Sequence, residues 1–167
     1  VRERLSEYIA RFKNIGNGKM SEWLRYKLYS YASNWNKYYE QYKVKSIIDN
    51  IFYKFYNDLR WAEIRGDKLV PEDVIKSWLV IMHPIIPFTT EYISRNLMKS
   101  RISDLKVELK PIENHIEDYL IQILEDMIIV ASKGGNKLYI GIAKKWKFEA
   151  YNMISEQGLD KVIDTPE

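Results

Sequence analysis

Two prolines interrupt an apolar stretch in the middle of the chain, and this feature constrains the fold most. The stretch runs from Trp78 to Ile93 and holds Pro84 and Pro87. Pro84 lacks an N–H group and disfavours helical geometry at the residue before it, so the preceding helix is predicted to end near Met82. Pro87 is tolerated in a first helical turn. The sequence therefore predicts a rigid elbow between two core helices. Its residues are Trp78, His83, Pro84, Pro87, Phe88 and Glu91.

Apolar residues at helical spacing predict further helices on both sides of the elbow. They cover residues 2–13, 21–42 and 44–64 before it, and the elbow helices themselves cover 71–82 and 87–98. In the range 21–42, apolar residues recur at steps of four and three from Leu24 to Tyr42, which is typical of a helix that packs along a bundle partner. Short connections favour antiparallel neighbours.

The pattern changes after residue 100. Residues 104–109 alternate apolar and charged side chains, which predicts a half-buried strand. A helix over 112–132, a strand over 137–143 and a helix over 145–157 follow. We therefore expect a mainly α protein: an antiparallel helical bundle over residues 1–100, then a small α/β C-terminal extension over 101–167 with two short strands and two helices.

Few residues could support catalysis or hold a metal. The chain has no cysteine, and its two histidines, His83 and His115, fall on different predicted elements. A zinc site needs three or four suitably spaced ligands, so we expect no metal site and no catalytic residues. For His83, a helix cap or a buried hydrogen bond is the simpler role. There is no apolar run of membrane-spanning length and no signal peptide, and we expect a cytoplasmic protein.

The net charge of +3 permits nucleic-acid binding without requiring it. Two cationic groups are candidates for RNA contacts. Arg60 and Arg65 lie near the end of the helix predicted over 44–64; alternatively, Asp58 and Arg60 each reach another helix as buried anchors. Lys144, Lys145 and Lys147 surround Trp146, and lysines interleaved with aromatic residues suit a phosphate backbone. The alternative there is a solvated lysine face with Trp146 in the core.

Three motifs in order resemble a known module. They are Trp23-Leu-x-x-x-Leu28, Asn57-Asp-Leu-Arg-Trp61 and the elbow from Trp78 to Glu91. Together they resemble the helical anticodon-binding bundle of the leucyl-, isoleucyl-, valyl- and methionyl-tRNA synthetases. The segment from Lys137 to Phe148 is similar to one near the C-terminal end of archaeal and eukaryotic-type leucyl enzymes.

The resemblance implies a non-catalytic, tRNA-positioning region of a leucine–tRNA ligase that contacts the tRNA backbone mainly by shape and charge. The chain starts at Val1 without an initiator Met, and we expect it to be a piece of a longer protein. ATP and Mg would then be cofactors of the parent's catalytic domain, with none in this chain. The implied partners are leucine-specific tRNA and that catalytic domain, with no DNA and no membrane. Two alternatives remain: a protein-interaction scaffold, and a synthetase paralogue that no longer charges tRNA.

Overall fold

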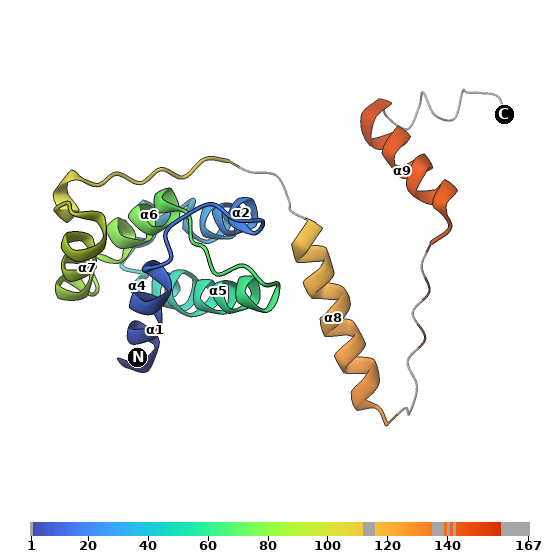
Figure 1. Ribbon diagram of the computed structural model, residues 1–167, viewed down its shortest axis with the longest axis horizontal. Coiled ribbons are helices and arrows are strands. Elements are labelled where there is room, and N and C mark those ends of the chain that lie inside the picture. The colour runs from blue at the N-terminus through green and yellow to red at the C-terminus, as the bar shows by residue number, and fades with distance from the viewer. Residues whose placement is uncertain (1, 112–115, 135–138, 140, 142, 158–167) are drawn as a thin grey trace. The chain divides into compact units, whose positions relative to one another are not determined.

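The computed structural model describes residues 2–111, 116–134, 139, 141 and 143–157 (Figure 1). The chain divides into two compact units, Val1–Leu120 and Ile121–Glu167. The described part is mainly helical and contains no strand, so the predicted α class is confirmed.

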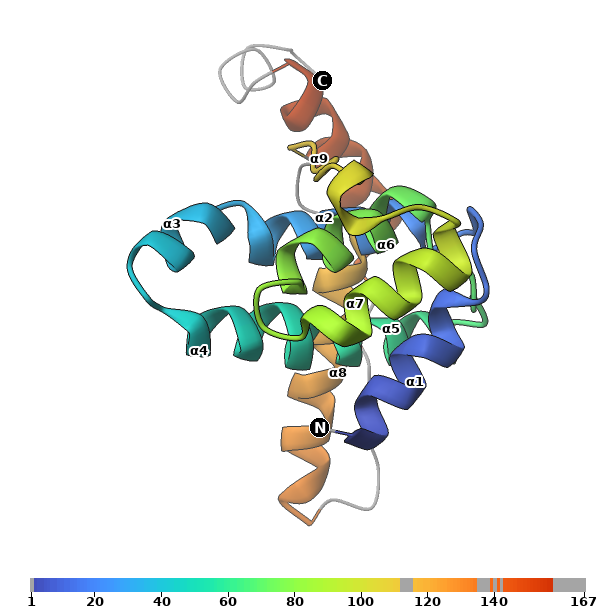
Figure 2. The ribbon, with the colours of Figure 1, turned by 90° about the vertical axis from the view of Figure 1, so that its left-hand side faces the viewer.

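The first unit is a helical bundle. Its α-helices are α1 (Arg2–Phe12), α2 (Ser21–Ala32), α3 (Trp35–Glu40), α4 (Val44–Ile47), α5 (Phe55–Ile64), α6 (Glu72–Met82) and α7 (Pro87–Ile93). Two short π-helical segments, η1 (Ile48–Lys54) and η2 (Ser94–Met98), extend α4 into α5 and lengthen α7, and a 3-10 turn, η3 (Ile102–Asp104), follows. In Figure 2, α2 and α3 run in the opposite direction to α4 and α5. The predicted helices over 44–64 and 87–98 therefore exist, each with a π segment.

Aromatic residues fill the core where α1, η1 and α6 meet. The Tyr8 ring lies 4.5 Å from Trp78 and 5.3 Å from Phe52, centroid to centroid, and all three are buried. The Tyr8 hydroxyl donates a 2.7 Å hydrogen bond to the Phe52 carbonyl, and Trp78 Nε1 donates one of 3.0 Å to the Ile51 carbonyl. These bonds satisfy polar groups that would otherwise be costly to bury. They also tie the elbow helix α6 to η1.

The predicted single helix over 21–42 is wrong, because Ser33 and Asn34 break it between α2 and α3. Short polar side chains compete for backbone hydrogen bonds and disfavour helix interiors. The seam is consequently buried at Leu24 and Leu28, whereas Tyr42 is 91% exposed and has a positive φ of 55°.

The loops before α2 and after α5 are held together by Asp67. Its carboxylate accepts hydrogen bonds from the backbone N–H of Met20 at 2.8 Å and of Leu69 at 3.0 Å. The loops pair directly where Gly16 N donates to the Val70 carbonyl and Val70 N donates to the Asn14 carbonyl. These bonds fix the entry of α2 relative to the end of α5.

The strand predicted over 104–109 is also wrong. Asp104 ends η3, and the following residues are extended but have no strand partner among the described residues. The alternation was a correct guide to burial, since Leu105, Val107 and Leu109 are partly buried and the residues between them are exposed. The segment packs on helices instead, and Glu108 N donates a 2.9 Å hydrogen bond to Ser77 Oγ on α6. Alternating apolar residues indicate that one side of a segment is buried, but they do not specify whether a strand or a helix packs against that side.

Two longer helices follow. Helix α8 (Ile116–Ser132) begins in the first unit, and α9 (Lys145–Gln157) lies in the second, so the helices predicted over 112–132 and 145–157 are confirmed in their described parts. The strand predicted over 137–143 falls largely outside the described residues, as does His115.

Candidate nucleic-acid interface

The elbow has the geometry that its prolines dictate. Helix α6 ends at Met82 and α7 begins at Pro87. The Thr90 hydroxyl lies 3.2 Å from the Ile86 carbonyl and 3.0 Å from the Pro87 carbonyl, so its proton is directed to these acceptors. His83 Nδ1, 2.8 Å from Thr90 Oγ1, is then the donor to that oxygen. The imidazole is therefore engaged in closing the elbow.

The other elbow residues differ in burial. Trp78 is fully buried, whereas Pro84 is exposed and Phe88 is 91% exposed. Glu91 accepts a hydrogen bond from Arg95 Nε at 2.6 Å and one from the backbone N–H of Ile102 at 3.3 Å. The Arg95 guanidinium is the main reason that the pKa of Glu91 is lowered. Glu91 thereby fastens α7 to the turn that follows η2.

Arg60 and Arg65 lie on α5 and just beyond its end, in different environments. Arg60 is exposed and forms no ion pair with any described residue. Arg65 Nε donates to Glu117 Oε1 at 2.7 Å, and Trp61 Nε1 donates to the same oxygen at 2.7 Å. A phosphate group would have to compete with Glu117 for Arg65, whereas Arg60 is available.

The first turn of α8 is held on the bundle by two neighbouring carboxylates. Glu117 binds Trp61 and Arg65 as described, and Asp118 accepts from Trp23 Nε1 at 2.8 Å and from Lys27 Nζ at 3.2 Å. Both tryptophans belong to the sequence motifs, and their indole N–H groups supply the donors. The motifs indicated apolar helix faces but gave no sign of this carboxylate pair.

Asp58 and Arg60 are two residues apart on α5 and point to opposite sides of the helix: Asp58 is buried and Arg60 is exposed. Asp58 is only 7% exposed, is hydrogen-bonded to Tyr31 on α2, and leaves Oδ2 without a hydrogen-bond partner. Burial raises the pKa of its carboxyl to about 7, against the opposing charge of Lys27. The expectation that Asp58 reaches another helix is therefore correct, and the same expectation for Arg60 is wrong.

The lysines of α9 and its approach are exposed in the second unit. Lys144, Lys145 and Lys147 all face solvent, and Lys145 forms a 3.5 Å ion pair with Glu149, one turn away. Trp146 is 59% exposed, and Lys147 Nζ lies 5.6 Å from the centroid of its ring. Trp146 is thus outside any core formed by the described residues.

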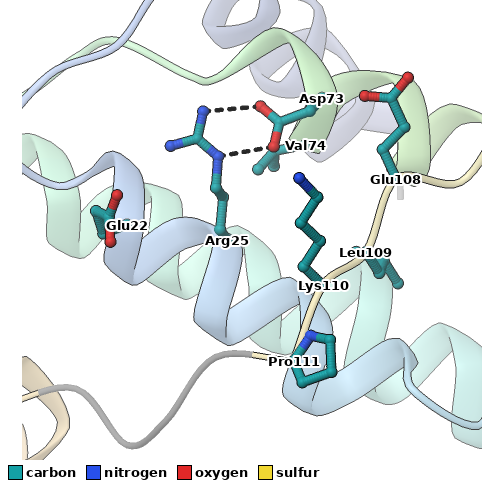
Figure 3. A pocket seen from close by; sticks show the side chains of 8 residues that line it. All are labelled: Glu22, Arg25, Asp73, Val74, Glu108, Leu109, Lys110 and Pro111. Atoms are coloured by element: carbon teal, nitrogen blue, oxygen red, sulfur yellow. Dashed lines mark hydrogen bonds and ion pairs between the residues drawn. The ribbon is translucent and has the colours of Figure 1, made fainter.

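A pocket of about 530 Å³ lies where α2, α6 and the extended segment meet (Figure 3). Arg25 reaches across it to form two hydrogen bonds with Asp73, at 2.7 and 3.0 Å. The charged lining consists of Glu22, Asp73 and Glu108 against Arg25 and Lys110. Because carboxylates outnumber cations and Arg25 is already paired, this pocket disfavours phosphate.

Among the described residues, no group of three or more His, Asp or Glu side chains is placed to hold a metal ion. Within the same part of the chain, no helix has the length and hydropathy needed to cross a bilayer.

The chain belongs to the family of anticodon-binding domains of tRNA ligases, because the family's profile matches residues 21–150. Curated relatives carry the name leucine–tRNA ligase. The one from Pyrococcus abyssi is 25% identical over 93% of this chain and 18% of its own length. The one from Methanocaldococcus jannaschii is 26% identical over 82% of this chain and 16% of its own length. The chain thus spans less than a fifth of these relatives. No solved structure matches it significantly.

Proposed function

We propose that this chain is a non-catalytic, tRNA-positioning region of a leucine–tRNA ligase. The observation that carries the proposal is the family match over residues 21–150, a range that contains the motifs around Trp23, Trp61 and Trp78. Leucine specificity rests on the names of the archaeal relatives. The reaction itself, with ATP and Mg, would belong to a catalytic domain elsewhere in the same polypeptide.

The contacts in this proposal are mainly with phosphates. Arg60 supplies an exposed cation without an acidic partner among the described residues, and Lys144, Lys145 and Lys147 supply a second exposed group. Phosphate contacts position a nucleic acid without reading its sequence. Arg65 would take part only where RNA displaces Glu117. In this proposal, the five cations orient the tRNA and do not select its bases. They are Arg60, Arg65, Lys144, Lys145 and Lys147.

We further propose a division of labour along the chain: residues 1–100 form the bundle, and residues 101–167 form a C-terminal extension. The first turn of α8 supports an attachment between them, because Glu117 and Asp118 bind four donors on the bundle. A small α/β arrangement with a strand over 137–143 remains a prediction for this extension.

A binding titration tests the proposal. The whole chain is titrated with leucine-accepting tRNA transcripts at two salt concentrations, alongside the Lys144→Ala/Lys145→Ala/Lys147→Ala and Arg60→Ala variants. We expect weak, salt-steep binding, and the triple variant should lose about three counterions from the salt slope. Lys37→Ala is a matched control, as an exposed cation on α3. Absence of tRNA binding at low salt would refute the proposal.

A second candidate function, docking of another protein domain, is favoured by α8. Ile116, Ile128, Ile129 and Val130 are each more than half exposed on it. Apolar patches of this kind mark interaction sites. In the context of a longer ligase, the catalytic domain of the same polypeptide would be such a partner.

A further inference from the structure

The outer face of α7 and η2 combines exposed aromatic rings with cations. Phe88 and Tyr92 lie one turn apart on one side of α7, Arg95 follows on η2, and Lys99 is the left-handed residue at the end of η2. All four are exposed, Phe88 by 91% and Tyr92 by 58%, whereas Thr90, Ile93 and Ser94 face inward and are buried. Helix α7 lies in front of the bundle in Figure 2. We call Phe88, Tyr92, Arg95, Lys99 and Arg101 the α7 outer face.

The cationic end of this face lines an open pocket. Arg95, Lys99, Ser100, Arg101 and Asp104 surround a volume of about 480 Å³. Lys99 and Arg101 form no ion pair with any described residue, so their charges are available to a ligand. Arg95 is held by Glu91, and Asp104 accepts a hydrogen bond from the Ser103 hydroxyl at 3.2 Å. Arg95 is paired with Glu91, and the Ser100 hydroxyl donates a 3.4 Å hydrogen bond to the Arg101 carbonyl, so Lys99 and Arg101 are the two cations left without an ion pair among the described residues. Two such positive charges against the single carboxylate of Asp104 suit an anion such as a phosphodiester.

The backbone holds the pocket in shape. Lys99 adopts the left-handed conformation, with φ of 55° and ψ of 29°, at the end of η2. This conformation is unfavourable for a residue with a side chain, so it needs support from its surroundings. Ser94 Oγ supplies it by donating a 2.7 Å hydrogen bond to the Ser100 carbonyl, and Glu91 adds a bond to Ile102 N–H. The turn thus places the Lys99 and Arg101 side chains beyond the last helical turn.

The pairing of rings and cations distinguishes between partners. Protein interfaces are enriched in aromatic residues and arginine and depleted in lysine, so by composition only Lys99 argues against a protein partner. Single-stranded nucleic acids, in contrast, are bound by aromatic rings that stack on bases beside cations that track the backbone. The α7 outer face has both elements within a few helical turns, so its chemistry favours RNA over a protein partner.

We infer that the α7 outer face binds unpaired nucleotides of an RNA loop, with bases stacked on Phe88 and Tyr92 and phosphates bound by Lys99 and Arg101. This inference rests on the proposed function and deepens it. The five cations named under that proposal address phosphates alone, whereas this face distinguishes unpaired from paired nucleotides. Glu91 is a positioning residue here, since it holds Arg95 and the turn at Ile102.

The test compares two probes on the whole chain: a short oligo(U) strand, whose bases are free to stack, and an RNA duplex with the same number of phosphates. Phe88→Leu/Tyr92→Leu keeps an apolar surface but removes both rings. Lys99→Ala/Arg101→Ala removes two charges. Lys43→Ala/Lys45→Ala removes two exposed charges near α4 and serves as the matched control.

We expect the leucine variant to bind oligo(U) at least about tenfold more weakly and the duplex unchanged, since stacking contributes about 1–3 kcal/mol per base. The Lys99→Ala/Arg101→Ala variant should weaken both probes and lower the salt slope by about two, more than the control does. If the leucine variant binds oligo(U) as the unsubstituted chain does, the rings do not stack on bases and the inference is wrong.

The same measurements separate this inference from the proposed function. Retained tRNA binding that is insensitive to the α7 variants but sensitive to Arg60→Ala would overturn the inference and leave the proposed function standing. Loss of all RNA binding at low salt in the unsubstituted chain would overturn both. A third outcome would assign the face to protein docking. In it, Phe88→Leu/Tyr92→Leu still binds oligo(U), and the catalytic domain of the parent ligase slows hydrogen exchange at the α7 amides.

Discussion

The buried carboxyl of Asp58 makes a sharp prediction about how stability depends on pH. Asp58 is packed among Tyr31 and Lys27 from α2, Lys54 from η1 and Asp118 from α8. Desolvation is the largest influence and raises its pKa from 3.8 to about 7. Because the folded protein then binds the proton more tightly than the unfolded chain does, the free energy of unfolding falls as pH rises between about 4 and 7.

The magnitude follows from the shift. A rise from 3.8 to about 7 corresponds to about 4 kcal/mol of destabilisation from this group, complete above pH 7. Asp58→Asn removes the titration and keeps the side chain's size, so its advantage over the unsubstituted chain should grow by about 3 kcal/mol from pH 5 to pH 8. The absolute advantage will be smaller, because an unpaired buried amide costs about 1–3 kcal/mol.

Urea unfolding followed by tryptophan fluorescence at pH 5, 6, 7 and 8 measures this difference, provided that the m value is unchanged. Asp49→Asn, at an exposed position on η1, is the control and should show a flat difference. Tyr31→Phe should move the midpoint of the pH dependence upward, because it removes a hydrogen bond to the carboxyl. A pH-independent difference for Asp58→Asn would show that Lys27 and Lys54 keep the carboxylate ionised, and would refute the reasoning.

Three further predictions concern single contacts. Gly18→Ala should destabilise the chain by about 1–3 kcal/mol in urea unfolding, because its Cβ would lie 2.2 Å from Asp67 Oδ2. Gly16→Ala should be tolerated far better, because its Cβ would lie 3.4 Å from the Leu69 side chain, and equal effects of the two variants would contradict this prediction. Tyr8→Phe should cost about 1 kcal/mol through loss of the bond to the Phe52 carbonyl, and an unchanged urea midpoint would argue against that bond. Trp23→Phe should speed amide exchange over residues 116–120 more than in α6, since Asp118 also loses a donor there, and an equal effect on both would argue against that bond.

Much of the bundle could be predicted from the sequence because its signals are local. Proline geometry placed the end of α6 at Met82 and the start of α7 at Pro87, and helical spacing gave the run from Val44 to Ile64. The sequence does not predict the break at Ser33 and Asn34, because the regular apolar pattern from Leu24 to Tyr42 outweighs two weak helix formers. Residues 104–109 show the corresponding limit for strands: alternation reveals a half-buried segment, and only tertiary structure decides whether another strand or a helix face lies beside it.

The candidate site was harder to predict, because it depends on which charges find partners across the fold. Arg60 and Arg65 look equivalent in the sequence, yet Glu117, fifty-two residues beyond Arg65, engages only that arginine. The α7 outer face could not be predicted either, because the sequence does not show which of its residues are exposed. The sequence indicates Phe88 only as an elbow residue beside prolines, and its 91% exposure is what distinguishes it from the buried Trp78. The signal was present as an aromatic–cationic repeat of four, three and four residues, and exposure is what gives that repeat a functional meaning.

The elbow therefore affects both the buried core on its inner side and the α7 outer face. On its inner side, the contact between His83 and Thr90 joins the end of α6 to α7 and fixes the angle between them, while Trp78 ties α6 to η1 through the Ile51 carbonyl. Fixing that angle also fixes the direction in which α7 presents Phe88 and Tyr92. A change at His83 that loosens the elbow should consequently weaken oligo(U) binding without touching any nucleotide, and His83→Asn, which can still donate to Thr90, should retain more binding than His83→Ala. If His83→Asn binds oligo(U) more tightly than His83→Ala, the geometry of the proline elbow contributes to the proposed RNA contact of α7.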